Sequence, residues 1–183
     1  MNYIIFDLEA TCWRDRGSGY QSEIIEIGAL SINQAQQIQS EFSQFVRPQI
    51  HPLLSPFCTE LTTITQEDVD TAADFPTVLQ DFQDWIKQNG EPYLLCSWGF
   101  YDRKQLTKDC EYHGLATDWL ASHISVKHQY AKLTHARRPM GMSAALKREK
   151  LQLEGTHHRG IDDARNIAKI FLQHFGRWEH GGD

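Results

Sequence analysis

The sequence lacks the features that mark several special classes of protein. Its four cysteines include no C-x-x-C pair, which argues against a zinc knuckle or a dithiol redox motif. The start, MNYIIFD, has no basic region and no cleavage site of small residues, so we expect no signal peptide and a protein of the reducing cytoplasm. No apolar run approaches the roughly 18 residues of a membrane helix, so we expect no membrane partner.

Positive charge is scarce overall but concentrated in one segment. The chain has 18 Lys and Arg against 24 Asp and Glu, and a net charge of −6 by itself argues against a nucleic-acid partner. Between residues 127 and 150, however, the only acid is Glu149. Such a segment is either a solvated loop and helix face or a local surface that binds phosphates whatever the total charge. Its basic residues are Lys127, Lys132, Arg137, Arg138, Lys147, Arg148 and Lys150.

Repeats, low-complexity stretches and linkers are also missing, so 183 residues predict one domain over 1–176 with a loose tail at 177–183. The first three predicted strands form an antiparallel meander, and a helix, a fourth strand and mainly helices follow them. This order indicates an α/β domain with a mixed sheet. The ambiguous segment 123–135 is read as a short strand and then a helix. Strands are predicted at 3–10, 23–32, 40–48 and 92–98, and helices at 75–90, 101–114, 141–151 and 162–176.

The first predicted strand, YIIFDLEA, ends in two carboxylates. Residues i and i+2 of a strand point to the same face, so Asp7 and Glu9 project together. Two anions so close repel each other, and the usual resolution is a hard cation such as Mg²⁺ or Mn²⁺. The alternative is an exposed strand end where the pairing is accidental.

Further acids open two predicted helices. Asp102 follows the fourth strand, where the alternative role is a helix N-cap. Asp162 and Asp163 open the last helix, and His157 and His158 each lie five residues before one of them. Acids at helix starts are often caps or partners of the helix dipole, and a loop histidine is often plain surface.

Taken together, FDLEATC, SWGFYDRKQL and HHRGIDDARNIAKI resemble the three motifs of the DEDDh 3′-5′ exonucleases, which have an RNase H-like fold. The linking segment, from LSPFC to LQDF, is similar to the branch that acts on histone mRNA, small interfering RNA and ribosomal RNA 3′ ends, which includes bacterial homologues. The resemblance covers about residues 3–172. It implies an RNase H-like mixed sheet, a meander plus parallel strands, flanked by helices.

The resemblance also implies roles for individual residues. Asp7, Glu9, Asp102 and Asp163 would hold two divalent cations, Mg²⁺ or Mn²⁺, and His158 would be the general base. The reaction would be two-metal hydrolysis from the 3′ end of RNA, or of single-stranded DNA, releasing 5′-mononucleotides.

Helical geometry favours one of the two histidine registers. Successive residues of a helix turn by about 100°, which places Asp163 at the border of the apolar stripe of the last helix and Asp162 almost opposite its middle. A metal ligand must face the sheet, so Asp163 is favoured, and His158 with it. The family pattern H-x-G-x-D-D agrees.

Substrate contacts follow from the same resemblance. Phe57 and Tyr101 lie where the branch places aromatic residues around the 3′-terminal base, and Trp13 where related enzymes have an apolar wedge. The backbone from Leu8 through Ala10 to Thr11 is expected near the terminal sugar. The alternative for each aromatic residue is ordinary packing.

The leading hypothesis is therefore a metal-dependent 3′-5′ exoribonuclease, and the basic segment 127–150 is a candidate track for upstream phosphates. Two alternatives remain open: a catalytically silent nucleic-acid-binding module, and a phosphodiesterase acting on small nucleotides or short oligonucleotides. The sequence leaves the oligomeric state open.

Overall fold

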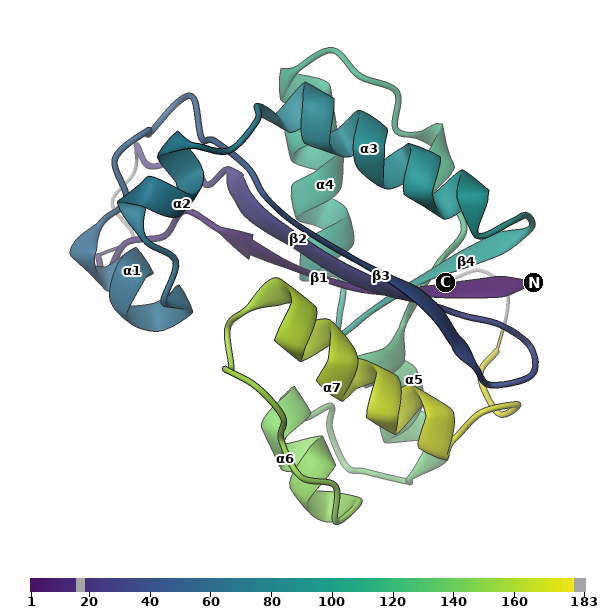
Figure 1. Ribbon diagram of the computed structural model, residues 1–183. Coiled ribbons are helices and arrows are strands. Elements are labelled where there is room, and N and C mark those ends of the chain that lie inside the picture. The colour runs from purple at the N-terminus through teal and green to yellow at the C-terminus, as the bar shows by residue number, and fades with distance from the viewer. Residues whose placement is uncertain (16–18, 180–183) are drawn as a thin grey trace.

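A mixed sheet lies at the centre of the computed structural model, which describes residues 1–15 and 19–179 (Figure 1). The strand order is β3-β2-β1-β4-β5. The first three strands pair antiparallel, while β4 pairs in parallel with both β1 and β5. The predicted meander and mixed sheet are confirmed. The strands are β1 (Asn2–Ala10), β2 (Ile24–Ile32), β3 (Ile38–Phe45), β4 (Tyr93–Ser97) and β5 (His123–Ser125).

Helices cover both faces of the sheet. In Figure 1, α3 and α4 lie above the sheet and α5, α6 and α7 below it. The sequence predicts the long helices but not α1 and α2, which are too short to show a clear apolar period. The helices are α1 (Pro56–Thr62), α2 (Gln66–Asp70), α3 (Phe75–Gln88), α4 (Tyr101–Tyr112), α5 (Val126–Leu133), α6 (Met142–Arg148) and α7 (Gly160–Gln173), with a 3₁₀ turn at Asp118–Leu120.

Strand β1 is buried on both faces, which explains its continuous apolar run. Tyr3 and Ile5 pack in the core cluster that includes α7, and Ile4 and Phe6 pack in the cluster that includes α3 and α4. Because side chains alternate along a strand, the α7 side of β1 continues from Ile5 into the two carboxylates at its end.

A close approach between β2 and α7 fixes the start of α7. A Cβ atom on Gly28 would lie 2.0 Å from the backbone nitrogen of Ile161 and 2.1 Å from the carbonyl carbon of Gly160. Only glycine allows this contact. The glycine therefore brings the first turn of α7, which carries two acids, against the sheet.

The C-terminal segment is not a loose tail over its described part. Trp178 is buried, its indole N–H donates to the carbonyl of Phe171 at 2.9 Å, and the two rings stack. The backbone N–H of Glu179 donates to Gln129 at 2.8 Å. The expectation of a loose tail from 177 is wrong for these residues, and 180–183 lie outside the described residues. No helix of the described chain is long and apolar enough to span a membrane.

Candidate active site

The end of β1 carries the first two acids of the site. Glu9 is only 8% exposed and Asp7 is half-buried. Carboxylate oxygens of Asp7, Glu9 and Asp163 all lie within 4.8 Å of one another. The predicted pair on one strand face is therefore joined by an acid from the far end of the chain.

Asp102 joins the same cleft from the first turn of α4. It is not the N-cap, a position held by Phe100 without a side-chain hydrogen bond. Its buried carboxylate instead accepts a hydrogen bond at 3.3 Å from the backbone N–H of Leu8, the residue between the two acids of β1. The start of α4 is thus tied to the middle of the acidic pair.

The two adjacent acids of α7 point in different directions. Asp163 is 5% exposed and lies in the cleft. Asp162 faces the loop before the helix, where it accepts a hydrogen bond from the backbone N–H of Thr156 at 2.8 Å and pairs with Arg165 at 3.0 Å. The orientation predicted from the helical period is confirmed.

Burial of several like charges raises the proton affinity of the cleft. Desolvation, followed by the charges of Asp102, Glu9 and Asp163, raises the pKa of Asp7 well above its ordinary value. Burial, followed by the charges of Asp163, Glu26 and Asp102, raises the pKa of Glu9 to about 9. Burial raises that of Asp102 to about 6, against the lowering effect of its backbone hydrogen bonds. The described residues thus leave the negative charge of this cleft poorly compensated.

The donor set of the cleft fits hard divalent cations. It consists of carboxylate oxygens from Asp7, Glu9, Asp102 and Asp163, which are the ligands that Mg²⁺ and Mn²⁺ prefer. A cation there would also relieve the repulsion that raises the carboxylate pKa values. The cleft has a volume of about 330 Å³ and is open to solvent at Tyr101 and His157.

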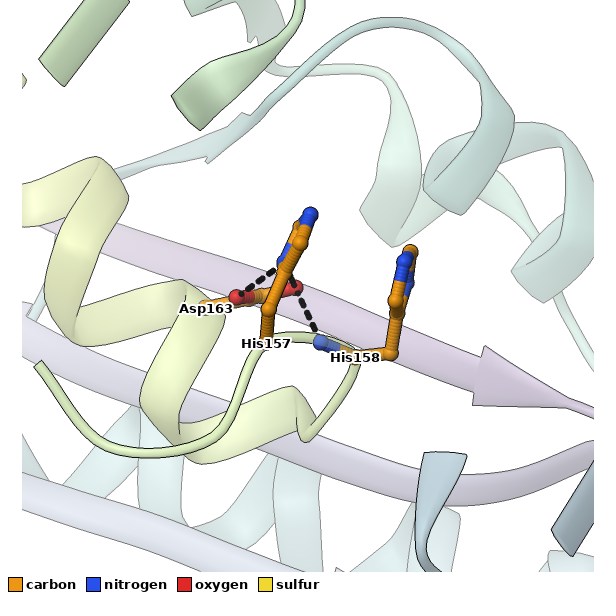
Figure 2. A group of neighbouring side chains, drawn as sticks. All are labelled: His157, His158 and Asp163. Carbon is orange, nitrogen blue, oxygen red and sulfur yellow. Dashed lines mark hydrogen bonds and ion pairs between the residues drawn. The ribbon is translucent and has the colours of Figure 1, made fainter. Parts of the chain in front are cut away.

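Both histidines of the HHRG segment reach Asp163, in different ways. Figure 2 shows the two rings side by side, with the His157 ring next to the Asp163 carboxylate. The His157 Nδ1 atom lies 2.9 and 3.0 Å from the two carboxylate oxygens. The backbone N–H of His158 donates to the same carboxylate at 3.0 Å. The ring of His158 stacks on that of His157 with centroids 4.0 Å apart. Burial, and then the neighbouring His157, lower the pKa of the His158 imidazole.

Three aromatic residues predicted to contact substrate line one cavity beside the cleft. Trp13, Phe57 and Tyr101 surround a volume of about 540 Å³, and Tyr101 also lines the acidic cleft. The Trp13 ring stacks on Tyr20 with centroids 4.5 Å apart, so its face toward that residue is already covered. The guanidinium of Arg14 lies 5.3 Å from the Phe57 ring centre.

The residues whose backbone is predicted to lie near the terminal sugar have side chains that face the protein interior. The side chains of Leu8, Ala10 and Thr11 are buried. The Thr11 hydroxyl accepts a hydrogen bond from the backbone N–H of Glu23 at 2.9 Å. Among the residues that the structure describes, Leu8 lines the acidic cleft, whereas Ala10 and Thr11 line neither the cleft nor the aromatic cavity.

Comparison with known proteins identifies the family. The family model described as Exonuclease matches residues 4–171, which is nearly the whole chain. The chain belongs to this exonuclease family. Its fold is accordingly the RNase H-like fold that the sequence resemblance implies, with the mixed sheet described above.

The relatives of this exonuclease family member place it in the predicted DEDDh branch. It is 36% identical to ERI1 exoribonuclease 2 of Xenopus laevis over 91% of the chain, and 35% identical to ERI1 exoribonuclease 3 of Homo sapiens over 92%. The nuclease domain of 3′hExo, a DEDDh family member solved bound to rAMP, superposes with a TM-score of 0.89 at 32% identity, covering 94% of this chain and 90% of that one. The chain spans 27% and 52% of the length of the two curated relatives.

Sequence reasoning missed a buried ion pair that supports the site in this family member. Glu26, near the start of β2, is fully buried beside Glu9 in the strand register. Its carboxylate accepts hydrogen bonds from Arg159 at 3.1 and 3.3 Å and from the backbone N–H of Gly160 at 2.9 Å. The pair anchors the segment between His158 and α7. A glutamate inside an otherwise apolar strand was the available signal, since a buried carboxylate requires a partner.

Proposed function

We propose that the chain is a metal-dependent 3′-5′ exonuclease that hydrolyses RNA from its 3′ end and releases 5′-mononucleotides. The observation that carries this proposal is the convergence of Asp7, Glu9, Asp102 and Asp163 in one cleft, with two imidazoles at its rim. A catalytically silent binding module has no need for four carboxylates, three of them buried, that destabilise one another.

The residues of the cleft divide the chemistry between them. The four carboxylates would hold two divalent cations, Mg²⁺ or Mn²⁺, which when bound lower the pKa of water and stabilise charge on the phosphate. His158 is the proposed general base. Because burial and His157 lower its pKa, its imidazole is neutral near pH 7 and can accept the proton of the attacking water.

The aromatic cavity is the proposed site of the 3′-terminal nucleotide. Phe57 and Tyr101 offer ring surfaces for stacking, which contributes about 1–3 kcal/mol per base and tolerates any sequence. Trp13 extends this surface where it joins Tyr20. The similarity to exoribonucleases, including a solved 3′-exonuclease described as recognising the histone mRNA stem-loop, supports RNA as substrate. Single-stranded DNA is the second candidate substrate.

The basic segment is the proposed track for phosphates upstream of the cleft. None of its Lys or Arg side chains forms an ion pair with a carboxylate of the described residues. The one acid of the segment, Glu149, turns inward to the Tyr130 hydroxyl at 2.7 Å. Arg137, Arg138 and Met140 line a surface cavity of about 550 Å³, and Met142, two residues after Met140, lines the cleft.

The test uses single-stranded RNA and matched DNA carrying a label at the 5′ end, with Mn²⁺, with EDTA, and with the Asp7→Asn protein. The expected result is a ladder of 3′-shortened products that disappears with EDTA and in the variant. A substrate with a blocked 3′ end should be resistant, which separates exonuclease from endonuclease cleavage. Hydrolysis of a dinucleotide without any ladder would favour the small-nucleotide phosphodiesterase. Binding without hydrolysis of any substrate would favour the binding module.

A further inference from the structure

The rim of the cleft contains a second group of metal-ligating atoms with a different chemical character. Ligand atoms of His157, His158 and Asp163 lie within 4.8 Å of one another. Two imidazoles and one carboxylate are suited to Zn²⁺ and similar borderline ions, whereas Mg²⁺ and Mn²⁺ favour the all-carboxylate group beside it. The two groups share one residue, Asp163.

The backbone brings the two neighbouring rings to the same side. His158 has φ of +65°, a left-handed conformation that is uncommon for a residue with a side chain. With it, the adjacent rings stack at an interplanar angle of 18°, and the His157 ring lies over the Asp163 carboxylate (Figure 2). Such local strain persists only where the surrounding structure enforces it, here through the hydrogen bonds to Asp163 and the anchored Arg159.

The distances between His157 and Asp163 are compatible with tetrahedral zinc, and the His158 ring, which stacks on His157 with centroids 4.0 Å apart, would rotate to direct its nitrogen at the same ion. With zinc about 2.0–2.1 Å from each donor, neighbouring donors of a tetrahedron lie roughly 3.3 Å apart. The His157 Nδ1 atom lies 2.9 and 3.0 Å from the Asp163 oxygens, so insertion of an ion between these atoms needs only a small displacement. The His157 side chain is 42% exposed, which gives an ion access from solvent and leaves room for water in the fourth position.

We propose that His157, His158 and Asp163 form a zinc site whose occupation inhibits the enzyme. Zinc held there would engage the lone pair that His158 needs to accept a proton, and would withdraw Asp163 from the carboxylate group. The inhibitory consequence rests on the proposed nuclease function, whereas the existence of the site does not.

The direct test is a zinc titration in competition with a chromophoric chelator in excess Mg²⁺. The Mg²⁺ occupies the carboxylate group and leaves the imidazoles free to bind zinc. The His157→Asn protein should bind zinc at least about tenfold more weakly than the unsubstituted protein, because loss of a mere supporting partner already costs about 10–100-fold. His135→Asn, which removes an exposed histidine from the loop after α5, is the matched control and should bind as tightly as the unsubstituted protein. Equal zinc affinity in His157→Asn, or no zinc binding at all, would overturn the proposal.

Two further measurements guard the interpretation. Mn²⁺ should raise the Tm of His157→Asn, and of a second variant, His157→Gln, as much as it raises that of the unsubstituted protein. This result would show that the carboxylate group is intact in both variants. The zinc concentration that halves RNA hydrolysis should increase in both variants by the same factor as the zinc dissociation constant. If zinc inhibits both variants as strongly as the unsubstituted protein, the inhibitory ion binds to the carboxylate group, and the proposal is overturned. If no nuclease activity exists, the chelator titration still decides the site.

Discussion

Replacing Arg159 tests how the interior of the sheet holds the catalytic loop. Its guanidinium is the only cation among the described residues that pairs with the fully buried Glu26, since the third hydrogen bond to that carboxylate comes from the neutral N–H of Gly160. Glu26 also lies beside the acids of β1 and contributes to the raised pKa values of Asp7 and Glu9. Arg159→Met keeps most of the side-chain length but leaves a buried anion among other anions.

The expected loss of stability can be estimated. Removing one partner of a buried ion pair costs about 3–5 kcal/mol. The Arg159 side chain is 27% exposed, so the lower end, about 3 kcal/mol, is appropriate. For a chain of this size each kcal/mol changes Tm by about 2–4 °C, which predicts a fall of about 6–12 °C. The double variant Glu26→Gln/Arg159→Met removes the unpaired charge and should recover most of this loss.

The assay is thermal unfolding of the metal-free proteins at neutral pH, followed by circular dichroism. A Tm for Arg159→Met within about 1 °C of that of the unsubstituted protein would contradict a stabilising buried ion pair, because so small a change is typical of an exposed pair. A double variant in which the two single losses simply add would also refute it, since partners in contact are expected to be coupled.

Four other predictions follow from the structure. Because the pKa of Glu9 is raised to about 9, the native state binds more protons than the unfolded chain between about pH 4.5 and 9. The Tm of the metal-free protein should therefore fall as the pH rises through this range, and Mn²⁺ should reduce that fall. Gly28→Ala should cost at least about 3 kcal/mol, measured by urea unfolding, because its Cβ would collide with the backbone of α7. Trp178→Ala should cost about 3–5 kcal/mol in the same assay. In Arg137→Ala/Arg138→Ala, the plot of log affinity for single-stranded RNA against log salt should be less steep by about 1.4, at about 0.7 per lost phosphate contact.

Two of these four predictions have a matched control variant. Arg47→Ala/Lys87→Ala removes the same charge from the segment after β3 and from α3, and should leave the salt slope unchanged. Equal slopes for both double variants and the unsubstituted protein would contradict a phosphate track. Trp178→Phe should lose much less stability than Trp178→Ala, and equal losses would contradict packing as the cause. A metal-free Tm that rises with pH would contradict the carboxylate electrostatics.

The sequence predicts those parts of the site that lie on strands and helices, where side chains repeat with a regular period. Alternation along β1 places Asp7 beside Glu9, and the helical period of α7 separates Asp163 from Asp162. Both periods depend only on the local backbone conformation, so they can be read from the sequence without knowledge of tertiary contacts. The family motifs then connect these elements with α4, which periodicity alone does not do.

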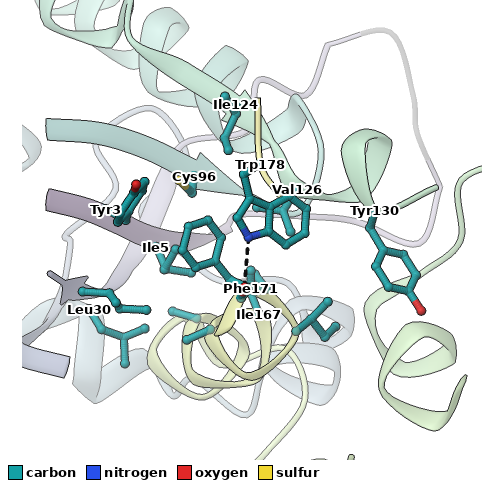
Figure 3. Close-up of a cluster of buried hydrophobic side chains, with 14 of the residues drawn as sticks. Tyr3, Ile5, Leu30, Cys96, Ile124, Val126, Tyr130, Ile167, Phe171 and Trp178 are labelled. Carbon is teal, nitrogen blue, oxygen red and sulfur yellow. Dashed lines mark hydrogen bonds between the residues drawn. The ribbon is translucent and has the colours of Figure 1, made fainter. Parts of the chain in front are cut away.

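The parts that escaped prediction depend on tertiary contacts or on single backbone angles. Trp178 stands in a segment rich in glycine and charge, and its burial, its stack on Phe171 and its hydrogen bond to the same residue show that it belongs to the core (Figure 3). The segment therefore reads as a tail until its partner is known. The contact of His157 with Asp163 depends on the left-handed backbone at His158, an angle that spacing does not reveal.

The most direct test of the proposed active site compares two adjacent residues of one helix. Asp163→Asn and Asp162→Asn make the same chemical change, but only the first alters the cleft, since Asp162 is bound to Thr156 and Arg165 outside it. We expect the rate of mononucleotide release from single-stranded RNA with Mn²⁺ to fall at least about a hundredfold in Asp163→Asn and to stay near that of the unsubstituted protein in Asp162→Asn. Equal rates in the two variants, or a larger loss in Asp162→Asn, would contradict the proposed active site.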